Sequence, residues 1–178
     1  MRIAGEYSFN RGREALESEF AAEWQEIKQV IAKVKSRAQR VLYEPESLTE
    51  AFKREMATRH WRKHRVACEL PISYYTPSYK PSTSLEGAFR EIDFVRNRVG
   101  VEVHLKRHTS MMVCSICAQM TILHNMGVID AGVVIAPVED FANRMSVGFS
   151  CFEQFVWDLE QRGVSNIDIP VVILGIAA

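Results

Sequence analysis

The sequence predicts an α/β fold in which a mixed central sheet is covered by helices on both faces. Segments with apolar residues at helical spacing alternate along the chain with short runs rich in β-branched residues. Two of these runs, residues 131–136 and 170–176, are almost wholly apolar, as expected for strands buried on both sides. The chain has 178 residues, which is the length of one ordinary domain, so we expect a single domain over residues 1–178.

The N-terminal third of the chain predicts two helices. Apolar and charged residues alternate at helical spacing over residues 13–41, which predicts one long amphipathic helix. A second helix is expected over residues 45–61, because Pro45 is followed by Ser47 and Glu50 in a capping-box pattern. Three apolar residues form the inner face that we expect for this second helix: Leu48, Phe52 and Met56.

The remaining elements follow from similar signals. Residues 66–75 are typical of a strand, and residues 76–84, with two prolines and five serine or threonine residues, are typical of a loop. Helices are expected over about 110–125 and 149–161, because Gly127 and Gly163 suit their C-terminal ends.

The most informative segment is a predicted β-hairpin. Two short β-rich runs, Ile92–Val95 and Val99–Leu105, flank Asn97 and Arg98. If those two residues form the turn, Arg96 pairs with Val99, and Asp93 lies opposite Glu102. Strand alternation then places Ile92, Phe94, Val101, Val103 and Leu105 toward the core, and Glu91, Asp93, Glu102 and His104 on the other face.

The facing acids of this hairpin indicate a metal site. Carboxylates about 5 Å apart on neighbouring strands repel unless a positive charge lies between them. Mg²⁺ is a natural partner for Asp93 and Glu102, because it takes one or two carboxylates together with waters and phosphate oxygens. His104, on the same strand face, would orient or deprotonate an attacking water. The alternative is a solvated acid pair neutralised by Arg90, Arg96 and Arg98.

Composition limits the other classes of function. The net charge is zero, but residues 53–65 hold six basic residues against one acid, which is compatible with phosphate contacts although more typical of a solvated helix end. No apolar run approaches the roughly 18–20 residues that cross a membrane. The first residues lack the apolar core of a signal peptide, and four cysteines in this length suggest reduced thiols, so a cytoplasmic protein is expected. Cys114 and Cys117 form a CxxC with no second pair, so we expect them to pack rather than bind zinc.

The hairpin also carries a family resemblance. Asp93, eight intervening residues and Glu102-Val103-His104 resemble the active-site signature of the PD-(D/E)XK nuclease superfamily. The segment Ile92–Val103 is similar to the catalytic hairpin of type II restriction endonucleases of the BglII/BstYI kind, and it resembles BstYI most. Further similar blocks follow in the same order along the chain: Leu42-Tyr43, Glu50–Lys53, His60–Lys63, Val128–Val133 and Val172–Ala177.

The resemblance implies a fold, an activity and partners. It implies a restriction-endonuclease-like mixed sheet flanked by helices, forming one PD-(D/E)XK nuclease domain. A homodimer would use Mg²⁺ to hydrolyse double-stranded DNA at a short palindromic site with GATC at its centre. No nucleotide cofactor and no membrane association are expected. The helix that begins near Ser110 would contribute to the dimer contact.

The same resemblance implies roles for single residues. Asp93 and Glu102 would be metal ligands, and Val103 would add its backbone carbonyl. His104 occupies the third motif position, which is lysine in most of the superfamily and glutamine in this family. This departure raises the alternative of a nuclease-fold protein that binds DNA with weak or no cleavage. Glu55 and Glu91 are candidates for an additional acid. A small-molecule metal hydrolase using the same acids is a third class.

DNA contacts are expected from several segments. Arg107 is the best candidate for reading a guanine, because a guanidinium fits its O6 and N7 atoms, although contact with phosphate alone is an equal alternative. The full set of expected DNA-binding residues is Lys106, Arg107, His108, Thr109, Arg96, Arg98, Ser146, Ser150, Arg62 and Lys63.

Overall fold

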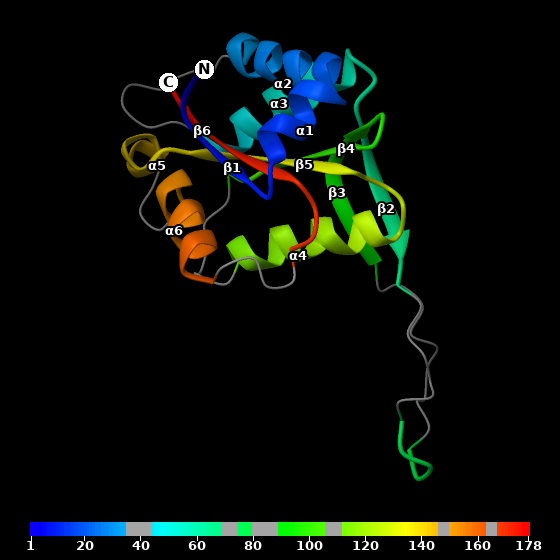
Figure 1. Ribbon diagram of the computed structural model, residues 1–178. Coiled ribbons are helices and arrows are strands. Elements are labelled where there is room, and N and C mark those ends of the chain that lie inside the picture. Colours follow the sequence, from blue (N-terminus) through cyan, green and yellow to red (C-terminus); the bar gives the residue numbers. More distant parts are fainter. Residues whose placement is uncertain (35–43, 69–74, 80–88, 106–111, 146–149, 163–166) are drawn as a thin grey trace.

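The computed structural model describes residues 1–34, 44–68, 75–79, 89–105, 112–145, 150–162 and 167–178. Within these residues, six strands form one sheet and six helices pack around it (Figure 1). The elements follow in this order: β1 (Arg2–Phe9), α1 (Gly12–Ser18), α2 (Ala21–Lys33), α3 (Pro45–Ala57), β2 (Arg62–Ala67), β3 (Phe89–Arg96), β4 (Val99–Val103), α4 (Met112–Asn125), β5 (Ala131–Pro137), α5 (Glu139–Met145), α6 (Phe152–Arg162) and β6 (Val171–Ala177).

The sheet is mixed, as the sequence predicts. Its strand order is β1-β6-β5-β4-β3-β2. The central strands β4, β5 and β6 run parallel, whereas β1 pairs antiparallel with β6 and the β2, β3 and β4 strands pair antiparallel in turn. Helices α1, α2 and α3 lie over one face, and α4 and α6 lie over the other (Figure 1). None of the described helices is long and apolar enough to cross a membrane.

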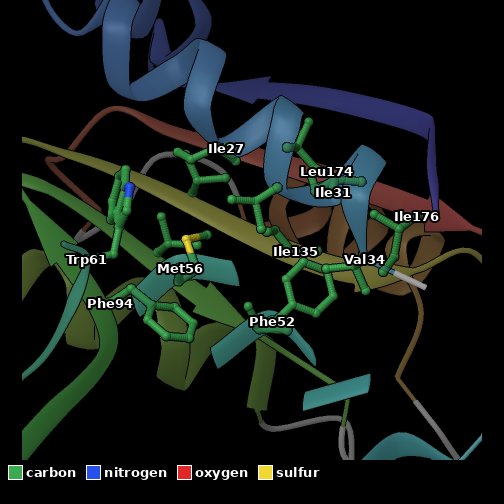
Figure 2. Packing of buried hydrophobic residues seen from close by; sticks show 14 of the residues in the cluster. Ile27, Ile31, Val34, Phe52, Met56, Trp61, Phe94, Ile135, Leu174 and Ile176 are labelled. Atoms are coloured by element: carbon green, nitrogen blue, oxygen red, sulfur yellow. The ribbon is translucent and has the colours of Figure 1, made fainter. Parts of the chain in front are cut away.

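The sheet separates two apolar clusters. Successive residues of β6 alternate between them: Val172 and Leu174 belong to the cluster under α1 to α3, and Val171 and Ile173 belong to the cluster with α4 and α6. Figure 2 shows part of the first cluster, where side chains of α2 and α3 meet those of the sheet. The predicted inner face of α3 is confirmed, because Leu48, Phe52 and Met56 are fully buried.

The prediction of one long helix over residues 13–41 is wrong. Its described part consists of α1 and α2, which are separated at Glu19 and Phe20, and residues 35–41 lie outside the described residues. Gly12 begins α1 so close to β6 that a Cβ atom would collide with the backbone of Val171. The spacing of apolar residues shows which residues face the core but not whether the helix axis is straight. The helical spacing therefore continues across the break between α1 and α2, although the chain changes direction there.

Other boundaries also differ from the prediction. Helix α3 ends at Ala57, and the capping box is not formed because Pro45 is already the first helical residue. Strand β2 begins earlier than expected, at Arg62. Strand β1 and helix α5 were not predicted. The end of α4 is confirmed, since Gly127 has a φ of 72° and donates to the carbonyl of His124. Gly163 lies outside the described residues.

Candidate active site

The predicted hairpin is present with the predicted register. Arg96 pairs with Val99, Val95 with Gly100, and Phe94 with Val101. The two turn residues, Asn97 and Arg98, have φ angles of 45° and 67°. Two central residues with positive φ define the type I′ turn, whose twist matches that of the flanking strands. A local signal therefore fixed the register, and with it the position of Asp93 opposite Glu102.

The two acids bridge the strands where their ladder ends. Phe94 and Val101 form the last pair of β3 with β4 in the described residues. Beyond it, the amide of Asp93 donates to Oε2 of Glu102 at 3.2 Å, and the amide of Val103 donates to Oδ2 of Asp93 at 3.1 Å. Each carboxylate therefore binds the backbone of the opposite strand. This arrangement, which we call the carboxylate fork, brings two half-buried acids together.

A β-bulge lies at the first of these acids. Arg62 pairs with Val95 and His64 pairs with Ile92, so Lys63 alone opposes both Asp93 and Phe94. The extra residue breaks the alternation, because Ile92 packs into the cluster with α4 and Phe94 into the opposite one. The expectation that Ile92 and Phe94 face the same core is therefore wrong. Bulges of this kind redirect a side chain, here at Asp93.

His104 lies deeper than the sequence suggests. Its amide donates to the carbonyl of Ile135 at 2.8 Å, which extends the pairing of β4 with β5 by one residue. The residue is only 3% exposed, and its ring packs edge-on against Phe155 of α6 with 5.5 Å between ring centroids. Strand alternation keeps it on the same side as Glu102, but the ring is buried in protein rather than presented to solvent.

The donor set of the carboxylate fork fits a hard divalent cation. Within the described residues, no group of three or more histidine, cysteine, aspartate or glutamate side chains is arranged to hold a metal. The fork instead offers two carboxylates and the backbone carbonyl of Val103 at the same strand end. Mg²⁺ is bound in this way, with few protein ligands and the rest from water and phosphate, whereas structural zinc needs four side chains. Cys117 is fully buried in the core.

The additional candidate acids are engaged in ion pairs. Oε2 of Glu55 lies 3.3 Å from Nη1 of Arg59, which follows two residues after the end of α3. Glu91 lies 2.6 Å from Lys63 on the neighbouring strand, and its backbone carbonyl accepts a hydrogen bond from Gln119 of α4. The structure thus gives each of these acids a basic partner within the protein.

Two acids of α2 hold the turn of the hairpin, a role that the sequence analysis missed. Glu26 accepts hydrogen bonds from Arg96 at 2.9 and 2.7 Å and from the indole of Trp61 at 3.0 Å. The side-chain amide Nδ2 of Asn97 donates to Oε1 of Glu23 at 2.6 Å. Trp61 is 35 residues from Glu26 in sequence, and Arg96 and Asn97 are 70 and 74 residues from their acids, so no local pattern could have revealed these contacts.

The second turn arginine is also bound within the protein. Arg98 makes a two-pronged ion pair with Asp130 and donates to the carbonyl of Gly127 at 2.6 Å. The hydrogen bond from Arg98 lowers the pKa of the Asp130 carboxyl, and the charges of Arg98 and His124 lower it further. The turn is thereby attached to the end of α4.

The structure places the expected DNA-binding residues in different environments. Arg62 and Lys63 are exposed at the start of the edge strand β2. Ser150 is only 4% exposed. Lys106, Arg107, His108, Thr109 and Ser146 lie outside the described residues.

Comparison with known proteins agrees with the predicted family and fold. A family model described as "Restriction endonuclease BglII/BglIII" matches residues 4–176. No curated protein matches the sequence. The structure resembles restriction endonuclease BglII complexed with a DNA 16-mer, with a TM-score of 0.70 and 18% identity over 100% of this chain and 79% of that chain. It also resembles free BglII, with a TM-score of 0.68 and 17% identity over 100% of this chain and 80% of that one.

The predicted family and fold are therefore confirmed, while the closer likeness to BstYI stays a prediction. A match over residues 4–176 includes the hairpin, the carboxylate fork and both edges of the sheet. The chain belongs to the BglII/BglIII family of restriction endonucleases and is, by that membership, a type II site-specific deoxyribonuclease that binds DNA.

Proposed function

We propose that this chain, as one nuclease domain over residues 1–178, forms a homodimer that uses Mg²⁺ to cut both strands of a short palindromic DNA site. The observation that carries the proposal is the carboxylate fork, in which Asp93 and Glu102 are each held by the other strand's backbone. Magnesium, rather than another divalent ion, is proposed because oxygen donors of this kind suit a small hard cation. The resemblance to the family supports a site with GATC at its centre.

In the proposed mechanism the protein orients the donors before the substrate arrives. Asp93, Glu102 and the carbonyl of Val103 would hold the metal, and the backbone hydrogen bonds of the fork fix both carboxylates. When bound, Mg²⁺ supplies Lewis-acid stabilisation of the phosphate and lowers the pKa of water. His104 is the candidate for orienting the attacking water.

The DNA surface that we propose excludes two of the expected residues. Arg62 and Lys63 are exposed on β2, beside the strand that carries Asp93, so they suit phosphate contacts. Base reading is assigned to residues 106–109, and above all to Arg107. In the sequence these residues come after His104 and Leu105, which follow β4, the strand with Glu102. Arg96 and Arg98 are left out, because each guanidinium makes two hydrogen bonds to one carboxylate, of Glu26 or Asp130, whereas Lys63 makes a single ion pair with Glu91.

The homodimer has a candidate contact on α4. Ala118, Ile122 and Met126 recur every four residues and form one apolar stripe, which we call the α4 stripe. Its larger members are 41% and 51% exposed, although they are apolar. A palindromic site presents two equal half-sites, which a two-fold pair of identical subunits matches. A second copy of this chain is therefore the occupant that we propose for the stripe.

The test is cleavage of plasmid DNA by the purified protein with Mg²⁺ and, in parallel, with EDTA. We expect discrete fragments with Mg²⁺ and intact DNA with EDTA. Sequencing the fragment ends would give the site and the cut position. If no fragments form in Mg²⁺ on DNA rich in GATC-centred palindromes, the proposed reaction is wrong.

One observation favours a second candidate function, DNA binding with weak or no cleavage. The ring of His104 packs against Phe155 and is almost wholly buried, which limits its access to an attacking water. A mobility shift of duplex DNA without cutting would support this candidate. If the protein neither shifts nor cuts the DNA, the small-molecule hydrolase is favoured instead.

A further inference from the structure

Strand β3 is paired irregularly at the residue that carries the first acid. In the described residues its pairing with β4 covers only Phe94 to Arg96, whereas its pairing with β2 continues back to Phe89. Asp93 lies directly beyond the last pair with β4, and the β-bulge opposite Lys63 interrupts the register with β2 at the same point. The place of Asp93 therefore depends on contacts outside the regular ladder as well.

Helix α4 supplies two such contacts to the residues that precede Asp93. The side-chain amide of Gln119 donates a hydrogen bond to the backbone carbonyl of Glu91. The side chain of Ile92 is buried in the same apolar cluster as Met120 of α4. The helix thus holds both of these residues, one through its backbone and the other through its side chain.

These contacts are made on the face of the sheet to which Glu102 points. Val101 and Val103 belong to the cluster under α1 to α3, so strand alternation directs Glu102 to the face covered by α4 and α6 (Figure 1). His104, two residues later in the chain, packs against α6 on that face. Gln119 therefore approaches β3 from the side of the sheet on which Glu102 lies.

The hydrogen bond from Gln119 matters because packing between α4 and β3 is incomplete at this point. An open cavity of about 390 Å³ lies between the two elements, lined by Phe89, Arg90, Glu91, Ala118, Gln119 and Ile122. Lys63 also binds Glu91, but through an ion pair of two side chains that are 57% and 39% exposed, and exposed pairs contribute little. Gln119 acts directly on the backbone of the strand.

We propose that Gln119 is a positioning residue for the carboxylate fork, because its hydrogen bond to Glu91 fixes the backbone from which Asp93 reaches the metal. The carboxylates of Asp93 and Glu102 repel each other before a cation binds, so a strand without this attachment would be displaced more easily. Partners outside the ligand set orient metal ligands, and small displacements of such groups weaken catalysis. This inference rests on the proposed function, because it assumes that the fork binds Mg²⁺.

The experiment compares Gln119→Met and Gln119→Glu with the control Gln29→Met. Both changes of Gln119 keep the length of the side chain and remove its N–H donor. Gln29 is exposed on α2, so the control makes the same exchange away from the hairpin. Thermal unfolding shows that the variants are folded, and if one of the two Gln119 variants does not fold, the other serves.

Three quantities are measured on each folded variant. The first is hydrogen–deuterium exchange of residues 89–95, measured on the protein without metal or DNA. The second is the single-turnover rate of plasmid cleavage over a range of Mg²⁺ concentrations, which gives the Mg²⁺ concentration for half of the maximal rate. The third is affinity for a DNA duplex without metal.

We expect residues 89–95 to exchange on the order of 5-fold faster in both Gln119 variants, because one backbone hydrogen bond is lost. The Mg²⁺ concentration for half of the maximal rate should rise about 10-fold. The affinity for DNA without metal should stay at the wild-type value, since Gln119 is not a DNA contact in this inference. Gln29→Met should match the wild-type protein in all three measurements.

Unchanged exchange in the Gln119 variants would show that this side chain does not hold β3, and the inference is overturned. Faster exchange with the wild-type Mg²⁺ requirement overturns it as well, because the contact then serves stability alone. A change confined to DNA affinity would make Gln119 a DNA contact instead. Absence of cleavage by the wild-type protein overturns the proposed function, whereas the exchange measurement still decides whether Gln119 holds the strand.

Discussion

The amide of Val103 donates a hydrogen bond of 3.1 Å to the carboxylate of Asp93, across the gap where β3 and β4 separate. In return, the backbone amide of Asp93 donates a hydrogen bond to the carboxylate of Glu102. Two acids that would repel in isolation are thus kept together by backbone donors that would otherwise lack a ladder partner. These hydrogen bonds would preorganise the fork for the metal that we propose, and the following predictions test what depends on it.

Removing one charge from the fork should abolish cleavage without unfolding the protein. For Asp93→Asn we expect the Mg²⁺-dependent cleavage rate to fall on the order of 100-fold or more. The amide oxygen of asparagine can still accept the hydrogen bond from Val103, and repulsion from Glu102 is relieved, so the melting temperature should not fall. Cleavage assays, DNA mobility shifts and thermal unfolding check this, with the exposed Asp140→Asn as control. Normal cutting by Asp93→Asn would refute the site assignment.

Charges placed in the α4 stripe should separate the proposed dimer. Ile122→Asp with Met126→Asp puts two carboxylates where we expect a second copy, and buried unpaired charges are costly. Sedimentation velocity should show a dimer for the wild-type protein and a monomer for this variant. Gln25→Asp, an exposed change on α2, serves as the control and should remain dimeric. A variant that sediments like the wild type would place the interface elsewhere.

Glu26 should stabilise the fold through the hairpin turn. Glu26→Ala removes the acceptor for Arg96 and Trp61 together, and Trp61 is only 2% exposed. We expect the free energy of unfolding to fall by roughly 1–3 kcal/mol. Urea unfolding measures this, with the exposed Glu160→Ala as the comparison, for which the change should be small. Equal effects of both substitutions would argue against the network.

The ion pair of Asp130 predicts a pH-dependent contribution to stability. The pKa of Asp130 is lowered in the folded protein by the hydrogen bond from Arg98, so the folded state favours the charged form. Its contribution is therefore complete above the unfolded value of about 3.9 and is lost as the pH falls through the lower folded value. Unfolding of the wild-type protein and Asp130→Asn at pH 7 and in acid checks this.

At pH 7 the Asp130→Asn variant should be the less stable of the two. The difference should shrink below about pH 4, since the wild-type carboxyl then also loses its charge. A difference that grows in acid would contradict the sign of the shift. The pair is partly exposed, so high salt should reduce the effect at pH 7.

The sequence predicted the features that depend on neighbouring residues. The hairpin register follows from two turn residues, and the inner face of α3 follows from its spacing. Strand β1 was missed because a register shift between Ile3 and Gly5 interrupts its alternation: Ile3 packs against the cluster under α1 to α3, whereas Tyr7 and Phe9 pack against the cluster with α4 and α6.

The parts that could not be predicted depend on distant contacts. The bulge at Asp93 is visible only when β2 is aligned beside β3, since Lys63 and Asp93 are far apart in sequence. The partners of Arg96 and Arg98 lie on α2 and before β5, so the turn arginines were assigned to DNA. The burial of His104 likewise depends on α6, which reaches it from the C-terminal part of the chain.

The one-against-two pairing at Lys63 has a consequence for how this segment can vary. The bulge changes the direction in which side chains point between Ile92 and Phe94. The orientation of the Asp93 side chain therefore depends on the number of residues between the turn and the bulge as well as on their identity. Deleting or inserting a single amino acid there would rotate Asp93 out of phase with Glu102. Sequence exchanges should therefore be accepted in this strand far more readily than changes in its length.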